Sequence, residues 1–318
     1  MNNHLQSLRE ILFGIESQIG ETIIGQKDLI RKVIIALFSS GHVLLEWVPG
    51  LWKTKTVKTL ADILWFEFKR ISFTPDLLPS DLTWVEIYRP QTGRFEIRKW
   101  PIFTNILLAD EINRTPPKVQ SALLEGMEES QVTIGNETFT LPKPFFVIAT
   151  ENPLEQEGTY PLPEAELDRF FMKLILDYPK KEDEIKILSQ WKNSVESSQR
   201  KNTNRLSPEE LFEMREFIVK NIHIDEKIYE YIAGILEATR RKNDSLAYGA
   251  STRAWLALRD GARICALLDG RDYVTPDDIK YIALDVLRHR IGRSYEALAQ
   301  RISPDTIIGE ILESVKIP

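Results

Sequence analysis

Residues 42–54 of the chain are HVLLE followed by WVPGLWKT, and residues 55–64 continue as KTVKTLADIL. The first five residues form a short apolar run, which is typical of a buried parallel strand. The last ten have the mixed apolar and polar composition of a surface helix. The stretch therefore predicts a strand, a short loop and a helix that begins near Lys53.

The loop between this strand and helix nearly matches the pattern G-x-x-x-x-G-K-[ST]. In that pattern the loop amides cradle phosphates, the lysine reaches the β and γ phosphates, and the hydroxyl residue binds Mg²⁺. Both pattern glycines are tryptophan here, and a Lys-Thr pair that merely starts a solvated helix is the alternative interpretation. The predicted phosphate-binding residues are Trp47, Val48, Pro49, Gly50, Leu51, Trp52, Lys53 and Thr54, with Thr54 also a metal ligand.

Two further apolar runs end in polar residues. ILLADE places Asp110 and Glu111 at the end of one run, where Asp110 would hold Mg²⁺ and Glu111 would activate water. FFVIATEN places Asn152 beyond another, where its amide could hold that water. Taken singly, an acidic turn and a turn-forming asparagine explain these residues equally well. Together with Lys53 they share the carboxyl edge of a predicted parallel sheet, which is where such sheets bind ligands.

Apolar runs alternate with stretches long enough for helices, which predicts an α/β protein with helices on both faces of a mostly parallel sheet. The runs are 68–73, 106–109, 145–150 and 174–176, and two predicted hairpins pair 86–88 with 95–97 and 131–134 with 137–140. Beyond Pro179 the pattern is helical, with helix starts at Ser207 and Thr275. We expect a three-layer domain over residues 1–178 and a helical lid over residues 179–318.

The composition of the chain argues against several classes of function. The chain has 318 residues, 43% of them hydrophobic, and no apolar run approaches the roughly 20 residues of a membrane span. The net charge of -6 argues against a broad nucleic-acid surface. A single cysteine, Cys265, excludes an internal disulfide framework, and the scattered histidines have no zinc-ligand spacing. We expect a cytoplasmic protein without a membrane span.

Longer motifs resemble a family. IIGQ (23–26), FTPDLLPSDL (73–82), LLADEINRTPPKVQSALLEGMEE (107–129), ATENPLEQEGTYPLPEAELDRF (149–170) and GASTRA (249–254) are similar to the MoxR-like AAA+ ATPases. The similarity covers nearly the whole chain. It implies a P-loop NTPase core of the AAA+ type with a C-terminal helical lid, and ATP and Mg²⁺ as cofactors.

The resemblance also implies roles for single residues. Gln26 would lie at the nucleotide, Asn152 would be sensor 1, and Arg253 would be sensor 2, which reports nucleotide state to the lid. Arg169 would be an arginine finger acting on a neighbouring subunit; Arg114 could face a subunit interface. A surface ion pair is the alternative for Arg169 or Arg253 alone. The family further implies a homo-oligomeric, hexameric ring, hairpins that line its pore, and chaperone-like action on a client, often with a von Willebrand factor A domain partner.

Tryptophan replaces the family's glycine repeatedly, at Trp47, Trp52, Trp84 and Trp100, and Trp65 and Trp255 are plausible glycine positions too. The chain has 15 glycines and 7 tryptophans, which sum to 22, about 7% of 318 and close to the usual glycine share. A gene that uses UGA for glycine, translated with a code that reads UGA as tryptophan, would produce this pattern. The alternative is a degenerate ATPase whose tryptophans are real.

The expected activity is ATP hydrolysis coupled to remodelling or maturation of a partner protein. An indole at position 52 would crowd the phosphates, so the chain as printed should bind ATP poorly. A non-hydrolysing interaction module is one alternative. A helicase-like motor is another, because the first hairpin carries Arg89, Arg94, Arg98 and Lys99, although Glu86, Glu96 and the acidic chain oppose it.

Overall fold

A computed structural model gives the fold of the chain. It describes residues 3–47, 53–89, 94–99, 101–134, 137–152, 158–176, 181–191, 206–241 and 244–318. The predictions for residues 48–52, for Trp100 and for the turns at 90–93 and 135–136 lie outside the described residues. For Trp47, Lys53, Thr54 and residues 84–89 and 94–99 only the backbone is described.

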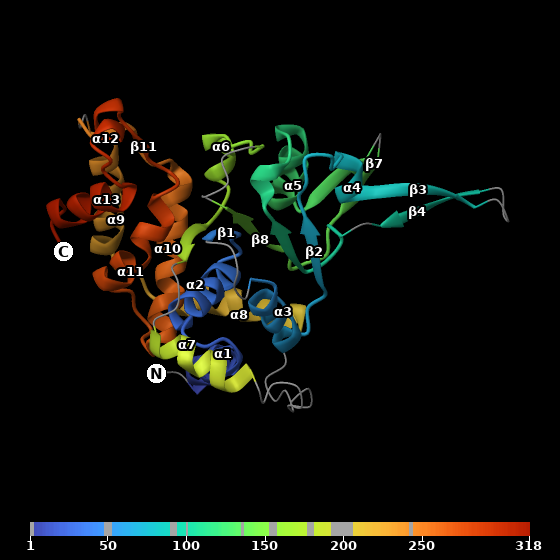
Figure 1. Cartoon of the computed structure of the whole chain (residues 1–318). Coiled ribbons are helices and arrows are strands. Elements are labelled where there is room, and N and C mark those ends of the chain that lie inside the picture. The colour runs from blue at the N-terminus through green and yellow to red at the C-terminus, as the bar shows by residue number, and fades with distance from the viewer. Residues whose placement is uncertain are drawn as a thin grey trace.

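The centre of the molecule is a parallel sheet of five strands in the order β2-β5-β8-β1-β9 (Figure 1). Its strands are β1 (Val43–Trp47), β2 (Phe68–Ser72), β5 (Ile106–Asp110), β8 (Phe146–Glu151) and β9 (Met172–Leu176). All four neighbouring pairs are parallel. Every strand of this sheet was predicted from an apolar run, and the predicted α/β class is confirmed.

Three antiparallel pairs complete the strands. They are β3 (Trp84–Arg89) with β4 (Arg94–Lys99), β6 (Gln131–Ile134) with β7 (Glu137–Thr140), and β10 (Leu246–Tyr248) with β11 (Gly292–Arg293). The first two are the predicted hairpins. Figure 1 shows that β3 and β4 extend well away from the body of the molecule.

Helices cover both faces of the sheet, and more helices follow it. They are α1 (Asn3–Thr22), α2 (Lys27–Phe38), α3 (Lys53–Leu64), α4 (Pro79–Thr83), η1 (Ile112–Arg114), α5 (Pro117–Glu129), α6 (Glu164–Leu167), α7 (Lys181–Trp191), α8 (Pro208–Asn221), α9 (Glu226–Arg240), α10 (Thr252–Leu268), α11 (Pro276–Leu287), α12 (Tyr295–Ala299) and α13 (Pro304–Ser314). Ser207 and Thr275 form capping boxes before α8 and α11, as predicted.

Successive side chains of a strand point to opposite faces of the sheet, so the apolar core consists of two clusters, one on each face. Val43 and Leu45 face one apolar cluster with α1, α2 and α3, whereas Leu44 faces a second cluster with α4 and α5. The first cluster continues without a break into α8, α9, α10, α11 and α13. The sheet and its two helical layers therefore form a three-layer core, and the C-terminal helices pack directly on one of its sides.

The C-terminal end of α3 provides evidence on whether glycine would suit one of the tryptophan positions better. Helix α3 ends at Leu64, and Trp65 follows in left-handed geometry with φ of +55°. The Phe66 amide donates to the Ala61 carbonyl at 3.1 Å, a bond typical of a helix that is closed by glycine. Trp65 itself is 58% exposed. Among the described helices, none is long and apolar enough to cross a membrane.

Candidate nucleotide site

The predicted phosphate loop has the structural context that its motif requires. Strand β1 ends at Trp47 and helix α3 begins at Lys53, so Lys53 and Thr54 form the first turn of a helix directly after a central strand. A helix N-terminus at the carboxyl end of a parallel strand favours bound phosphate, because its free amides and dipole face the anion.

Asp110 stands at the end of β5, two strands away from β1 in the sheet, and is nearly buried and held from two sides. The Thr150 hydroxyl donates to Asp110 Oδ1 at 2.7 Å, and Arg70 Nη2 donates to Asp110 Oδ2 at 2.6 Å. Thr150 lies on β8 and Arg70 on β2, the two strands that flank β5. The carboxylate is therefore fixed at the ligand-binding edge of the sheet.

Glu111 follows in an unusual backbone conformation. Its φ is 60° and its ψ is 50°, which is left-handed geometry in a residue other than glycine. The Glu111 amide donates to Thr150 Oγ1 at 2.9 Å, and its carboxylate pairs with Arg114 Nε at 3.1 Å. Strain of this kind costs about 1–3 kcal/mol and is found most often at functional sites. The bend turns the Glu111 side chain out of the strand and toward Arg114.

Two acidic side chains near the ends of β1 and β8 share one lysine of β9. Lys173 of β9 contacts Glu46 Oε2 at 2.7 Å and Glu151 Oε2 at 3.4 Å. Burial lowers the pKa of Lys173, but the two carboxylates outweigh burial and raise it above its usual value. Burial raises the pKa of Glu151 despite that lysine. Asn152 follows Glu151 and is 3% exposed, so its amide is fixed just beyond the end of β8.

The chemistry of these groups fits a magnesium ion bound with nucleotide. Asp110 offers a nearly buried carboxylate, and Mg²⁺ prefers oxygen ligands supplied by one or two carboxylates together with phosphate oxygens and water. In the described part of the chain, no three acidic, histidine or cysteine side chains gather into a metal site of their own. An ion here would rely on phosphate for part of its coordination.

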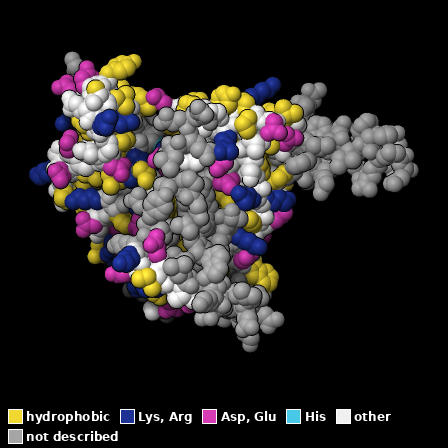
Figure 2. All heavy atoms as spheres, viewed as in Figure 1, with side chains coloured by type: hydrophobic (Ala, Val, Ile, Leu, Met, Phe, Trp, Pro, Cys, Tyr) yellow, Lys and Arg dark blue, Asp and Glu magenta, His cyan; other side chains and the backbone are white. Residues whose placement is uncertain are grey.

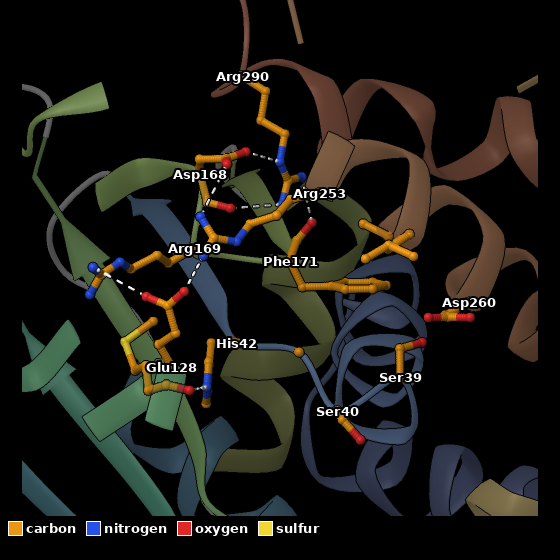
Figure 3. A pocket seen from close by; sticks show the side chains of 14 residues that line it. Ser39, Ser40, His42, Glu128, Asp168, Arg169, Phe171, Arg253, Asp260 and Arg290 are labelled. Atoms are coloured by element: carbon orange, nitrogen blue, oxygen red, sulfur yellow. Dashed lines mark hydrogen bonds and ion pairs between the residues drawn. The ribbon is translucent and has the colours of Figure 1, made fainter. Parts of the chain in front are cut away.

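Arg169 and Arg253 meet at a different place. A pocket of about 230 Å³ is lined by both arginines, by His42 and by Glu128 (Figure 3). Arg169 Nη2 lies 3.2 Å from Glu128 Oε2, and Arg253 Nη2 pairs with Glu128 Oε1. The chain thus brings the predicted finger and the predicted sensor 2 residue together on one carboxylate.

Asp168, next to Arg169 in the chain, joins this pocket to the C-terminal helices. Its side chain accepts hydrogen bonds from the Ser251 hydroxyl at 2.7 Å and from Arg290 Nε at 2.9 Å. Arg290 also donates to the carbonyls of Phe170 and Phe171. Burial lowers the pKa of Arg290 to about 10, although Asp168 opposes this shift.

The arginine pocket and the Asp110 site lie at opposite edges of the sheet. His42 and Arg169 precede the first residues of β1 and β9, whereas Asp110 is the last residue of β5 and Asn152 directly follows the last residue of β8. The five steps from His42 to Trp47 span roughly 16 Å at about 3.3 Å per residue. The described geometry therefore keeps Arg169 and Arg253 apart from the nucleotide edge of their own chain.

Gln26, also expected at the nucleotide, caps the N-terminus of α2 without a side-chain capping bond. Thr150, Arg70, Glu128 and Asp168 were not predicted from the sequence as site residues. Thr150 could have been found, because it stands one residue past Ala149, the partner of Ala109 in the sheet register. The other three act through pairings between distant segments, which leave no local pattern.

The fold and the strand-end site define an ATPase of the AAA+ class. Residues 42–172 match the model of the ATPase family associated with various cellular activities, and residues 238–311 match the AAA lid domain. Over 309 residues the chain is 44% identical to Chaperone MoxR1 of Mycobacterium tuberculosis, covering 95% of this chain and 81% of that one. The chain belongs to the MoxR-like family of AAA+ ATPases.

Two other relatives match along almost their full length. Identity is 46% to YeaC of Bacillus subtilis, covering 98% of this chain and 97% of that protein. A solved structure of a candidate ATPase from Cytophaga hutchinsonii superposes with a TM-score of 0.91 at 45% identity, covering 99% of this chain and 97% of that one. The fold, including its C-terminal helices, is therefore that of a known structure.

Proposed function

We propose that the protein couples binding and hydrolysis of Mg-ATP to chaperone-like remodelling or maturation of a partner protein. The observation that supports this most is the shared strand edge: the first turn of α3, Asp110, Glu111 and Asn152 all stand there. The name of the relative Chaperone MoxR1 supports the remodelling part. A hexameric ring, a von Willebrand factor A domain partner and a cytoplasmic location belong to the same proposal.

Each residue of the nucleotide site would have a role that follows from its position. Lys53 and the loop amides before it would bind the phosphates, while Thr54 and Asp110 would hold Mg²⁺, which when bound screens phosphate charge. Glu111 would orient and deprotonate the attacking water, and Asn152 would fix that water from the next strand. Gln26 would contact the nucleotide. Thr150 and Arg70 keep the Asp110 carboxylate in place.

We assign Arg169 and Arg253 to a neighbouring subunit's nucleotide. Both stand at the edge of the sheet opposite Asp110, so neither is placed to reach ATP held by its own chain. Cationic groups that approach the γ phosphate from a neighbour stabilise the charge of the transition state. This arrangement requires a ring, and it makes the activity depend on protein concentration.

Subunit mixing tests the assignment. We would prepare Glu111→Gln and Arg169→Ala in the chain that carries glycine at positions 47, 52, 84 and 100. Each variant alone should hydrolyse ATP at least tenfold more slowly than the parent. In mixed rings, Glu111→Gln supplies a finger to the intact site of Arg169→Ala, so part of the activity should return. No recovery in rings shown to be mixed would count against action between subunits.

We further propose that Trp47, Trp52, Trp84 and Trp100 stand for glycines read from UGA codons. The backbone at Trp65 supports this, since that tryptophan occupies a left-handed position that favours glycine. Trp255 gives no such support. It lies inside α10 and stacks on Tyr229, with ring centroids 5.9 Å apart.

The mass of the native tryptic peptide spanning residues 33–53 decides between glycine and tryptophan at positions 47 and 52. Glycine masses would support an intact phosphate loop. Tryptophan masses would favour a non-hydrolysing AAA+ interaction module. A helicase-like motor is supported less, because basic and acidic side chains of the described residues are interspersed on the face shown in Figure 2.

A further inference from the structure

Glu128 binds both arginines of the pocket, and none of the proposed roles uses it. We propose that Glu128 is a positioning residue that occupies the Arg169 and Arg253 guanidinium groups until phosphate from a neighbouring subunit's nucleotide displaces it. The identity of that phosphate rests on the proposed function. The competition between Glu128 and a phosphate anion depends only on this pocket.

The geometry gives Glu128 a bridging position. It stands in the last turn of α5, and its two carboxylate oxygens contact different arginines, one oxygen to Arg169 and the other to Arg253. Figure 3 shows the carboxylate between the two guanidinium groups, which approach it from different elements. Two cations this close would otherwise repel each other. Glu128 therefore holds both side chains at one spot before any ligand arrives.

The neighbouring carboxylate, Asp168, is bound differently. Its side chain is 17% exposed and is held by Ser251 and by Arg290, itself 2% exposed, and it also lies 3.5 Å from Arg253 Nη1. The Glu128 side chain is 41% exposed. Removing Asp168 from its partners would leave a buried cation unpaired, but Glu128 can swing into water at little cost. Of the two acids, Glu128 is the one that an incoming anion can replace.

Charge favours the replacement of the Glu128 carboxylate by a phosphate group at the two arginines. Ion pairs that are partly exposed to water contribute little, because the solvent screens them and the side chains lose freedom. A phosphate group carries more charge than a carboxylate and offers several oxygens to the forked guanidinium groups. Glu128 should therefore weaken phosphate binding without preventing it, and removing its charge should tighten that binding.

The proposal can be tested by measuring how inorganic phosphate binds to the full-length chain with its tryptophans. The thermal unfolding midpoint would be followed against phosphate concentration, with chloride matching the ionic strength, to obtain an apparent Kd. Glu128→Gln preserves side-chain shape and removes the charge. Glu129→Gln is the matched control, because it removes the same charge one residue along, where the carboxylate accepts a hydrogen bond from Gln131.

Glu128→Gln should lower the apparent Kd for phosphate roughly three- to tenfold, as expected for the release of one or two half-exposed ion pairs. Glu129→Gln should change it less than twofold. The gain from Glu128→Gln should vanish when Arg169 and Arg253 are both changed to Gln, which separates this pocket from any phosphate bound near Lys53.

Two results would overturn the proposal: equal gains from Glu128→Gln and Glu129→Gln, or no gain from Glu128→Gln, including the case in which neither protein binds phosphate measurably. The titration needs neither a ring nor hydrolysis. Failure here would leave the ATPase proposal intact, and an inactive ATPase would leave this result standing.

Discussion

His42 joins three segments of the core through one buried imidazole. Its Nε2 lies 3.0 Å from the Met127 carbonyl on α5, and the Val147 amide of β8 donates to its Nδ1 at 3.0 Å. Both bonds need the neutral ring with its proton on Nε2. Burial lowers the pKa of His42 to about 4, below its ordinary value of 6.5.

This shift predicts a pH dependence of stability. Between pH 6.5 and 4 the unfolded chain binds a proton that folded His42 excludes, so the free energy of unfolding should fall as the pH drops through this window. The loss from His42 is on the order of 3 kcal/mol. Urea unfolding at several pH values would measure it. His42→Gln should reduce this slope without removing it, because burial also lowers the pKa of His289. His223→Gln, at an exposed site, should not reduce it. Equal slopes in all three proteins would contradict the role of His42.

Thr150 gives a second prediction for a single side chain. Thr150→Val keeps the shape but removes the hydroxyl that donates to Asp110 and accepts from the Glu111 amide. We expect the free energy of unfolding to fall by about 1–3 kcal/mol, because these nearly buried groups lose a polar partner. Chemical denaturation would measure the change. Thr150→Ser, which retains the hydroxyl, should lose less, and equal losses in both variants would argue against this role.

Among the elements, β5 and β8 could be predicted most directly because their residues form apolar runs that are buried on both faces, as in ILLAD of β5. Strand β2 has a weaker pattern, because its sequence FKRIS includes Lys69 and Arg70 and only Ile71 is buried. Ser207 and Thr275 likewise mark helix starts with purely local chemistry. The short strands β10 and β11 were not predicted. Their pairing joins residues 246–248 to residues 292–293. Strands of three and two residues are too short to show a periodic pattern in the sequence.

The end of α3 is the element where tryptophan and glycine differ most clearly. Trp65→Gly should raise the free energy of unfolding by about 1 kcal/mol, because glycine adopts φ of +55° without the penalty paid by a side chain. Trp65→Ala is the control, since it removes the indole but keeps the β-carbon, and it should not give the same gain. If alanine stabilises as much as glycine, the gain comes from loss of the exposed indole, and the backbone argument fails.

At the scale of the whole molecule, the strand-end residues could be predicted because parallel strands bring their carboxyl ends to one edge. Asp110, Glu111 and Asn152 were found in this way. The position of Arg253 could not be, because it depends on how α10 docks against the core through Asp168 and Glu128. Pairings between residues 80 to 130 positions apart follow from tertiary packing, which no local pattern encodes.

The contacts of Asp168 with the C-terminal helices lead to a prediction for the stability of the whole molecule. Asp168→Asn removes the charge that pairs with buried Arg290 and should lower the free energy of unfolding by about 3–5 kcal/mol. Denaturant unfolding would detect this loss. Glu166→Gln, two residues earlier on α6, affects a carboxylate that accepts a hydrogen bond from the exposed Ser121 hydroxyl, and it should cost less than about 1 kcal/mol. A small loss for Asp168→Asn would mean that the link contributes little to stability.

We propose that this MoxR-like AAA+ chain is an ATPase that needs glycine in its phosphate loop. The most direct measurement is the steady-state rate of Mg-ATP hydrolysis for two full-length proteins, one with tryptophan and one with glycine at positions 47, 52, 84 and 100. We expect the glycine protein to hydrolyse ATP, Glu111→Gln to slow that hydrolysis at least tenfold, and the tryptophan protein to show little or no hydrolysis. Equal rates would contradict the steric argument, and no hydrolysis by a folded, assembled glycine protein would contradict the proposed activity.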